Sequence, residues 1–327
     1  MNPRPLSASS SAHRVGYVRP AVRLFSTAVA IIAMVTTTAN AQLSKPFLWE
    51  LTKEPAKDAP KDAPKDAAKD SKSVVLFGSL HVAKPDFYPV PDSVQKRFDD
   101  AKVLAVEADV TVPETQQACT RLAVTRDKLE SVLSAEDFAA LSGYIRAAAI
   151  PDALIENRKL WLVNLVVVGV ELGQLGVDFA RGLDVVFLRE AKFAKKRIVE
   201  VEGGALQCAA LAAAGPTETA AAMTRFLAAV RQNRMEKRLI EMLAAYRAGD
   251  GVAINRLVNE DYGDSADGVA SKRRIFDDRH PAMADKIDGY FKSPDSHFVV
   301  IGVGHMYGDN NLLEALAKRG IRATRIE

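Results

Sequence analysis

The chain has 327 residues, of which 48% are hydrophobic and 26% charged, an ordinary globular composition with ample material for a buried core. Its formal net charge of +3 comes from the first 41 residues, which hold four arginines and no acidic residue; the other 40 basic and 41 acidic residues give a net charge of −1. This balance excludes the basic surface typical of nucleic-acid-binding proteins, and we expect no nucleic acid partner.

The first 41 residues have the pattern of a secretory signal peptide. Four arginines precede an apolar run at residues 28–35, and Ala-Asn-Ala at 39–41 is a typical cleavage signal. The apolar run is too short for a comfortable membrane span. We therefore expect cleavage after Ala41, a periplasmic or secreted protein without a stable membrane span, and a single domain over 42–327. An uncleaved signal would instead anchor the chain to the membrane.

A repetitive segment separates the first two predicted strands. Strand-like runs occupy residues 47–51 and 73–81, and residues 55–72 between them contain a Lys-Asp-Ala-Pro repeat. The repeat has no apolar side chain larger than alanine or proline, so it cannot contribute to a core and we expect it to be disordered. It is predicted to be the loop of an expanded hairpin, with a spacer facing the cell wall as the alternative.

The middle of the chain is predicted to be mostly helical. A helix capped by Asp92 runs to Phe98 and leads to a strand at 102–109, and helices then extend over 114–189. The most apolar stretch, 160–177, is interrupted by three polar side chains, which favours a buried core helix over a membrane span.

Strands and helices alternate again toward the end of the chain. The predicted elements are a helix at 182–196, a strand at 197–204, a long helix at 217–248, helical turns on both sides of Pro281 within 273–291, a strand at 297–305, a helix at 310–320 and a final strand. This order predicts the α/β class: a mixed, largely parallel central sheet flanked by helices, with an all-helical insertion in the middle of the chain.

The two cysteines outside the first 41 residues, Cys119 and Cys208, both fall in stretches that are predicted to be helical. An exported protein permits a disulfide between them, and two buried free thiols are an equal alternative.

Four of the predicted strands end in an ionisable side chain. These side chains are His81, Glu107, Glu202 and His305. If the strands are parallel neighbours, the four side chains converge at the edge of the sheet where ligands bind in α/β proteins. Two imidazoles with one or two carboxylates suit zinc, manganese or cobalt, and such an ion makes hydroxide available near neutral pH.

Each strand that ends in histidine contains a glycine three residues before it. Gly78 and Gly302 lack a Cβ, so we expect the backbone to turn sharply there and to approach a neighbouring strand or ligand. Each ionisable residue alone is equally typical of a solvated strand end, and the four together favour a site. His297, at the start of its strand, belongs to the opposite edge and is excluded.

Several ordered motifs carry a resemblance to a known family. They are "FLWELTKE", "VVLFGSLHVAKPDFYPVP", "VLAVEAD", "GLDVVFLREAKFAKKRIVEVEGGALQ", "FDDRHPAMADKI" and "FVVIGVGHMYGDNNLLEALAKRGI". In this order they resemble the TraB/GumN (TraB–PrgY–GumN–TIKI) family over nearly all of the chain after residue 41, and the chain is most similar to a GumN-like bacterial member.

The family resemblance implies more about the function and the site residues than the spacing of the ionisable residues does. TIKI members are membrane-tethered, metal-dependent proteases that rely on the paired G-x-x-H motifs, a glutamate and an arginine. By motif this points to His81, His305, either Glu107 or Glu202, and Arg279. The family often has asparagine at the position of His280, which we expect to be a helix-surface residue rather than an extra polar group at the site.

The leading hypothesis is an exported metal-dependent hydrolase that cleaves peptides or proteins. His81, His305 and Glu202 would hold Mn, Co or Zn, and Glu107, Glu202 and Arg279 would be catalytic, although the sequence leaves open which glutamate is the ligand and which the base. GumN-type members are associated with exopolysaccharide gene clusters, so a non-catalytic periplasmic binding or accessory protein is the alternative. A third hypothesis uses a histidine base without metal. The sequence does not indicate the oligomeric state.

Overall fold

The computed structural model describes residues 43, 45–53 and 73–326. The predicted signal peptide at 1–41 and the repeat loop at 55–72 lie outside the described residues.

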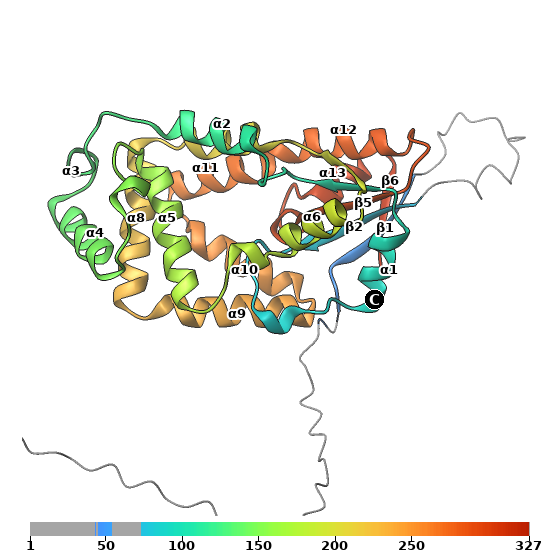
Figure 1. Ribbon diagram of the computed structural model, residues 1–327, viewed down its shortest axis with the longest axis horizontal. Coiled ribbons are helices and arrows are strands. Elements are labelled where there is room, and N and C mark those ends of the chain that lie inside the picture. The colour runs from blue at the N-terminus through green and yellow to red at the C-terminus, as the bar shows by residue number, and fades with distance from the viewer. Residues whose placement is uncertain (1–42, 44, 54–72, 327) are drawn as a thin grey trace, which may run out of the picture. The chain divides into compact units, whose positions relative to one another are not determined.

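Six strands of the described part form one sheet in the order β4-β3-β5-β2-β1-β6, of which β5, β2, β1 and β6 are labelled in Figure 1. Their bounds are β1 Leu48–Lys53, β2 Val74–Ser79, β3 Val103–Val106, β4 Arg197–Glu200, β5 His297–Gly302 and β6 Ile321–Arg325. The four strands β2, β5, β3 and β4 run parallel, and β1 lies antiparallel between β2 and β6. The sheet is therefore mixed and largely parallel, and the predicted fold class is confirmed.

The described helices connect and cover these strands. They are α1 Asp92–Asp100, α2 Pro113–Ala123, α3 Leu129–Val132, α4 Ala135–Ala147, α5 Leu160–Gln174, α6 Leu183–Phe193, α7 Gly204–Ala212, α8 Pro216–Arg231, α9 Arg234–Ala248, α10 Gly251–Tyr262, α11 Ala266–Ile275, α12 His280–Tyr290 and α13 Leu312–Ala317. Short 3-10 helices lie at η2 Pro85–Phe87, η3 Asp152–Leu154, η4 Phe179–Arg181, η5 Asp277–Arg279 and η6 Val303–Met306.

Two details of the helices differ from the sequence prediction. Helix α1 begins at Asp92 itself, with Pro91 at the N-cap and no side-chain cap. The long helix predicted over 217–248 is interrupted where Asn233 adopts a left-handed φ of 52°, which separates α8 from α9. Asparagine tolerates this conformation without a glycine. The periodicity of apolar residues continues across the break, so the sequence pattern does not indicate it.

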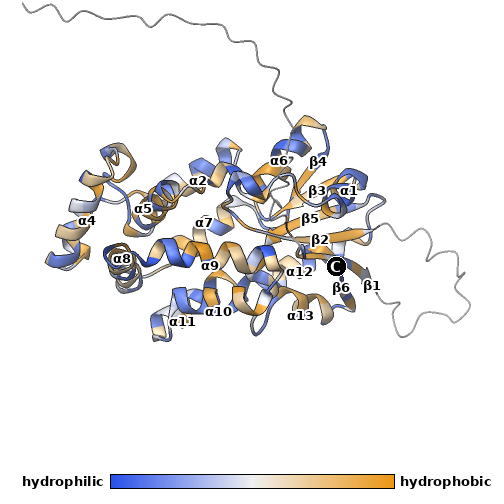
Figure 2. Ribbon diagram, turned by 90° about the horizontal axis from the view of Figure 1, so that it is seen from below, coloured by the Kyte–Doolittle hydropathy of each residue, from blue (hydrophilic) through white to orange (hydrophobic). Residues whose placement is uncertain are grey.

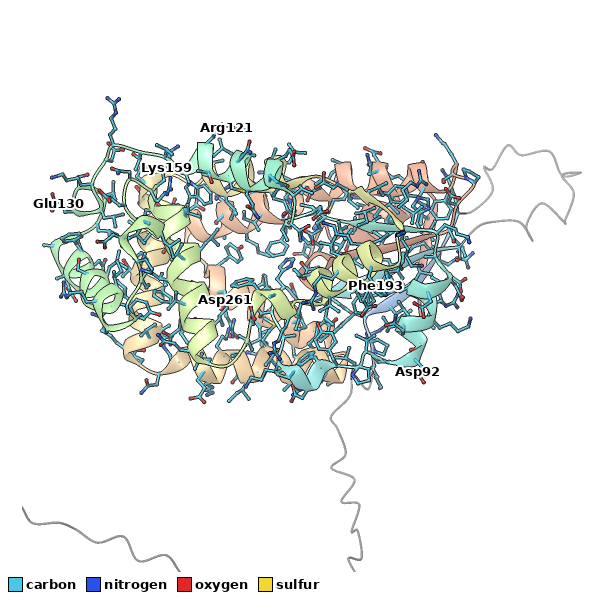
Figure 3. The ribbon with its side chains drawn as sticks, in the orientation of Figure 1. Asp92, Arg121, Glu130, Lys159, Phe193 and Asp261 are labelled. Carbon is cyan, nitrogen blue, oxygen red and sulfur yellow. A yellow bond between two sulfur atoms is a disulfide. The ribbon has the colours of Figure 1, made fainter. Side chains whose placement is uncertain are left out.

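The sheet has the buried character of a parallel sheet that is covered on both faces. The strands β2, β3 and β5 are buried along their whole length, and the hydrophobic colour runs along β2 and β5 in Figure 2. On one face, aromatic rings from the sheet, α1 and α6 pack with centroids 5.0–5.9 Å apart; they are Phe77, Phe98, Phe187 and Phe298. The last residue of α6, Phe193, lies outside this packing with 93% of its surface exposed (Figure 3).

Helices α9, α12 and α13 contribute to the same core. The Tyr246 ring of α9 is fully buried, and its hydroxyl donates a 2.6 Å hydrogen bond to the Gly78 carbonyl at the end of β2. This bond fixes the backbone three residues before His81, so the core also positions the edge of the sheet.

The helical insertion has an apolar cluster of its own, formed mainly by α4, α5 and α8. Val163 and Val167 of α5 are completely buried. The polar residues of α5 bond to neighbouring helices: Asn164 donates to the Thr219 carbonyl at 3.0 Å, and Glu171 accepts from Tyr144 at 2.8 Å. Helix α5 thus packs into this cluster along one side, but it is not the fully buried core helix that was predicted, because Leu165 is 45% exposed. Among the helices that the structure describes, none has the length and apolar character needed to cross a membrane.

A disulfide joins α2 to α7. Cys119 and Cys208 are bonded, with their Cα atoms 5.2 Å apart and a sequence separation of 89. Of the two alternatives left open by the sequence, the structure therefore has the disulfide.

Candidate functional site

The strand order brings the four predicted strand ends to one edge of the sheet. Glu107 follows β3 directly, His81 and Glu202 lie two residues beyond the ends of β2 and β4, and His305 lies in η6 after β5. Because these four strands are parallel neighbours, their carboxyl ends lie side by side, as the sequence analysis required. His297 lies at the other end of β5, where its ring stacks on Tyr290.

The carboxylate of Glu107 is the centre of the cluster. Its Oε1 accepts a 2.6 Å hydrogen bond from the backbone N–H of Gly302, and its Oε2 accepts one of 2.8 Å from Gln207 of α7. The same Oε2 accepts from Arg279 at 3.2 Å and lies 3.7 Å from Nε2 of His305. Donors from several elements thus surround a carboxylate whose side chain is only 8% exposed.

Arg279 links the two glutamates. Its Nε donates to Oε1 of Glu202 at 2.9 Å, its Nη2 donates to Oε2 of the same carboxylate, and its Nη1 donates to the Ile275 carbonyl at 2.6 Å. Glu202 is therefore held by a two-point ion pair, and its side chain is 5% exposed. The structure places both predicted glutamates and the predicted arginine in one buried network.

His305 and His280 form a chain of hydrogen bonds behind Glu107. Nδ1 of His305 lies 2.9 Å from Nε2 of His280, and Nδ1 of His280 lies 2.7 Å from the Asn310 carbonyl oxygen. Both histidines are buried, at 4% and 2% exposure. The expectation that His280 is a helix-surface residue is wrong: its position as the first residue of α12, against η6, turns the ring inward.

His81 has a partner on the opposite side of the site. Its Nδ1 lies 2.8 Å from Oδ2 of Asp184, the second residue of α6, and 57% of its side chain is exposed. A Cβ placed on Gly302 would lie 3.3 Å from Nε2 of His81 and 3.2 Å from Oε1 of Glu107. The free nitrogen of His81 therefore faces the same small space as Glu107.

The motif glycines serve close approach rather than a turn. Neither Gly78 nor Gly302 has a positive φ angle, so the change of direction from β5 into η6 at Gly302 does not itself require glycine. At Gly302 the missing side chain leaves room for His81 and Glu107, and at Gly78 it leaves room for Phe47, whose Cβ would lie 3.0 Å from an added Cβ. The approach to neighbouring groups that the sequence predicted is present at both.

Burial and neighbouring charges give the side chains of the cluster different protonation states. Burial would raise the pKa of Glu107, yet the neighbouring imidazoles of His305 and His81, Arg279 and the Gly302 amide lower it to about 2. Burial lowers the pKa of His305 to about 3, assisted by Arg279. Near neutral pH the site therefore holds an ionised carboxylate beside an uncharged His305 imidazole.

The pKa of His81 moves in the other direction. The surrounding protein disfavours its charge, but the Asp184 and Glu107 carboxylates outweigh this effect and raise the pKa above its ordinary value. Because more than half of the side chain is exposed, water screens the ion pair and limits the rise.

The donor chemistry fits a divalent metal ion, but its geometry is incomplete. Two imidazole nitrogens and a carboxylate are suitable ligands for zinc, manganese or cobalt, and each imidazole has an outer hydrogen-bond partner of the kind that orients metal ligands. Over residues 43, 45–53 and 73–326, no three histidine, cysteine or acidic side chains lie close enough together to hold an ion as they stand.

Three further residues belong to the cluster and were not among the predicted site residues. Asp184, Gln207 and His280 contact His81, Glu107 and His305 respectively. Asp184 and Gln207 fall within the motif that carries the family resemblance, at its Gly-x-Asp and at the glutamine after the acidic strand end, and this was the available signal. His280 falls within the motif "FDDRHPAMADKI", and the alternative that it is an extra polar group at the site is the one that the structure bears out.

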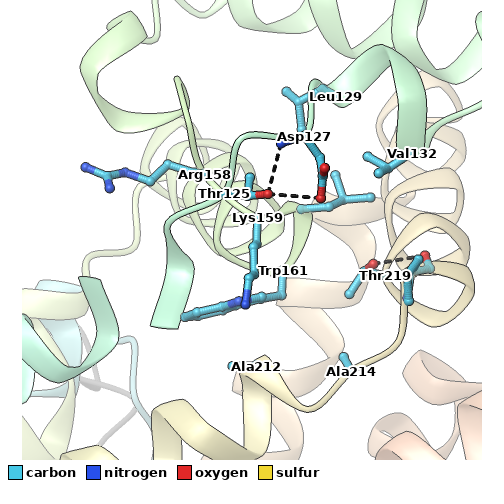
Figure 4. A pocket seen from close by; sticks show the side chains of 12 residues that line it. Thr125, Asp127, Leu129, Val132, Arg158, Lys159, Trp161, Ala212, Ala214 and Thr219 are labelled. Carbon is cyan, nitrogen blue, oxygen red and sulfur yellow. Dashed lines mark hydrogen bonds between the residues drawn. The ribbon is translucent and has the colours of Figure 1, made fainter. Parts of the chain in front are cut away.

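A separate cavity of about 240 Å³ lies in the helical insertion, near the start of α5 (Figure 4). Its lining includes Thr125, Asp127, Lys159, Trp161 and Thr219. None of the predicted site residues lines this cavity, so it is distinct from the sheet edge.

Comparisons with known proteins bear on the family of this chain. The chain is 26% identical over 242 residues to the uncharacterized protein YbaP of Escherichia coli K12 and to that of Shigella flexneri, which covers 74% of this chain and 86% of each relative. No solved structure matches it significantly. The model of the TraB/PrgY/gumN family matches residues 65–325, a segment that contains every residue of the cluster. This chain belongs to the TraB/PrgY/gumN family.

Proposed function

We propose that the chain is an exported, metal-dependent hydrolase that acts on peptide bonds. The observation that carries the proposal is the arrangement at the sheet edge, where two imidazoles with outer hydrogen-bond partners flank a buried, ionised carboxylate. Carboxylate-oriented and otherwise hydrogen-bonded histidines are typical of metal sites in hydrolases.

Nε2 of His81, Nε2 of His305 and the carboxylate of Glu107 are the donors that we favour. Glu202 was the expected third ligand, but Arg279 engages both of its oxygens, whereas Glu107 lies between the two imidazoles. A bound ion would supply a water of lowered pKa. Arg279 supplies positive charge for a developing oxyanion or a substrate carboxylate. Glu202, the glutamate left for the role of general base, is paired with Arg279 at both oxygens and would accept a proton only when a substrate draws Arg279 away from it.

A histidine base without metal is the second candidate. Both carboxylates are occupied by hydrogen-bond donors, and the low pKa of Glu107 makes it a weak base. His81 has an exposed ring that is oriented by Asp184, as a histidine base requires. Its raised pKa means that this base acts only at a pH high enough to deprotonate the ring.

Export and a peptide or protein substrate are part of the proposal. The leader-like first 41 residues support export, and so does the disulfide, since such bonds persist in oxidising compartments. The resemblance to TIKI-type proteases supports the peptide substrate.

Metal binding by purified protein of residues 42–327 tests the leading candidate. The protein is stripped with chelator, loaded with Zn²⁺, Mn²⁺ or Co²⁺, and its metal content and affinity are measured. We expect about one ion per chain, and affinity lowered by at least about tenfold in His81→Ala and His305→Ala. His297→Ala, at the opposite end of β5, is the matched control and is expected to bind like the wild type. Wild type that retains no ion under any loading contradicts metal dependence.

Digestion of a mixed peptide library separates the remaining candidates. Cleavage that disappears on chelation and returns with metal supports the leading proposal. Cleavage that survives exhaustive chelation but is lost in His81→Ala supports the histidine base. Peptide or glycan binding without turnover indicates the accessory-protein alternative and contradicts both hydrolytic candidates.

A further inference from the structure

We propose that His280 is a positioning residue that holds the ring proton of His305 on Nδ1 and so leaves the Nε2 lone pair of His305 free toward Glu107. This inference rests on the proposed function for its chemical meaning, but the proton position itself can be measured without any activity.

The Asn310 carbonyl determines which nitrogen of His280 carries a hydrogen. A carbonyl oxygen only accepts hydrogen bonds, and it lies 2.7 Å from Nδ1 of His280. Nδ1 of His280 must therefore carry a hydrogen. In the neutral ring, Nε2 of His280 then has a lone pair and no hydrogen.

The second step concerns the two facing nitrogens. Nε2 of His280 and Nδ1 of His305 are 2.9 Å apart, so one hydrogen lies between them. Since Nε2 of His280 is the acceptor, Nδ1 of His305 is the donor. The other nitrogen of neutral His305, Nε2, is then unprotonated, and this atom is the one 3.7 Å from Oε2 of Glu107.

The surroundings favour uncharged rings. His280 and His305 are both buried, their rings pack edge to face, and Phe276 packs against His305 with ring centroids 4.9 Å apart. The two nitrogens of His280 face a backbone carbonyl and a second imidazole rather than a carboxylate, so no anion offsets the cost of burying a charge on this ring, and the neutral pair is favoured. A charged His280 would donate through Nε2 instead and would reverse the proton order.

The acceptor at the end of the chain is fixed by the backbone. Asn310 has a φ of 55°, a left-handed conformation that asparagine tolerates, and the next residue, Asn311, caps α13 by accepting from the Glu314 N–H at 3.0 Å. The loop between η6 and α13 thus presents its carbonyl to His280, and the proton order follows from the fold rather than from solvent.

The position of the hydrogen on the His305 ring matters for the proposed site because a metal ligand or a base needs an unprotonated nitrogen. With the proton on Nδ1, His305 presents that nitrogen toward Glu107 and the space beside Gly302. With the proton on Nε2, the same ring would direct an N–H at the site.

Long-range ¹H–¹⁵N NMR of histidine-labelled protein (residues 42–327) at pH 7 measures the tautomer, with His305→Gln used to assign the signal. We expect the Nδ1–H form of His305 in the wild type. In His280→Gln the amide oxygen can replace the Nε2 acceptor, so the Nδ1–H form is expected to persist. In His280→Phe, which keeps the ring shape without an acceptor, His305 is expected to shift to the Nε2–H form or to a mixture.

Metal affinity gives a second readout on the same proteins. We expect His280→Gln to bind Zn²⁺ within about threefold of the wild type and His280→Phe to bind about 10–100-fold more weakly. An Nε2–H tautomer in wild-type His305 overturns the inference, as does an unchanged tautomer in folded His280→Phe. If every form fails to bind metal while the tautomers behave as expected, the metal-dependent proposal fails and the positioning role stands.

Discussion

Arg279 is the residue on which the charge balance of the site depends. It is the basic side chain that bonds to both Glu107 and Glu202, and the three side chains are 14%, 8% and 5% exposed. Burial opposes its charge, but the two glutamates raise its pKa further above an already high value. Removing it leaves two buried carboxylates without their cation, a much larger loss than that of a surface ion pair.

We therefore expect Arg279→Met to lower the free energy of unfolding by about 3–5 kcal/mol. The matched control is Arg273→Met, which removes an ion pair to Asp278 whose side chains are 70% and 52% exposed and is expected to cost less than about 1 kcal/mol. Urea unfolding of both variants and the wild type measures the difference. Equal losses in the two variants would contradict the buried network.

The sequence predicted which ionisable residues follow the ends of the strands. His81, Glu107, Glu202 and His305 each follow an apolar run, so their place at a sheet edge could be inferred from the run alone. His280 could not be inferred in this way, because its contact with His305 depends on how α12 packs against η6, 25 residues away in sequence.

For the helices and strands, the sequence predicted how they alternate but did not predict several of their boundaries. Buried parallel strands leave near-continuous apolar runs, and β2 and β5 were located from theirs. The break between α8 and α9 depends on one left-handed residue, Asn233, which leaves the hydrophobic period unchanged. The pairing of α2 with α7 through cysteines was one of two equal alternatives, since spacing alone does not indicate contact.

The disulfide between α2 and α7 is expected to stabilise the fold. It closes a loop of 89 residues between α2 and α7, and α7 carries the Gln207 that bonds to Glu107. We expect Cys119→Ser/Cys208→Ser to lower the free energy of unfolding by about 2–4 kcal/mol, mainly because the unfolded chain gains freedom. Thermal unfolding with and without reductant measures this.

The wild type should approach the double variant when it is reduced, while the double variant should not respond to reductant. Mass spectrometry after alkylation of the unreduced protein provides the control, and two alkylated thiols in the native protein would contradict the pairing.

At the scale of the whole molecule, the site is a product of the completed sheet. Its hydrogen bonds join Arg279 to Glu202 across 77 residues, Gln207 to Glu107 across 100, and Gly302 to Glu107 across 195. The sequence allowed a largely parallel sheet to be predicted. It did not allow the order β4, β3, β5 and β2 to be predicted, because local patterns do not show which strands are neighbours. Because the contacts vanish on unfolding, the ionisation of the site and the stability of the fold are linked.

This linkage predicts how stability depends on pH. The pKa of His305 is about 3 in the folded chain and 6.5 when unperturbed, so the unfolded chain binds more protons between these values and stability falls as pH drops below 6.5. Glu107, with a folded pKa of about 2 against 4.5, adds a loss of the same sign only below pH 4.5. His81 has the opposite sign, because its stabilising pair with Asp184 is fully present below pH 6.5 and is lost as pH rises through its elevated pKa.

Between pH 6.5 and pH 5, His305 alone should therefore cost about 2 kcal/mol, or on the order of 4 °C in Tm. Replacing it in His305→Gln should remove that part of the pH dependence, whereas His81→Gln should change the slope mainly above pH 6.5. Calorimetry of the wild type and both variants from pH 5 to pH 8.5 measures the three curves. Curves for the wild type and His305→Gln that stay parallel from pH 6.5 to pH 5 would mean that His305 is not the buried neutral imidazole on which the proposed site depends.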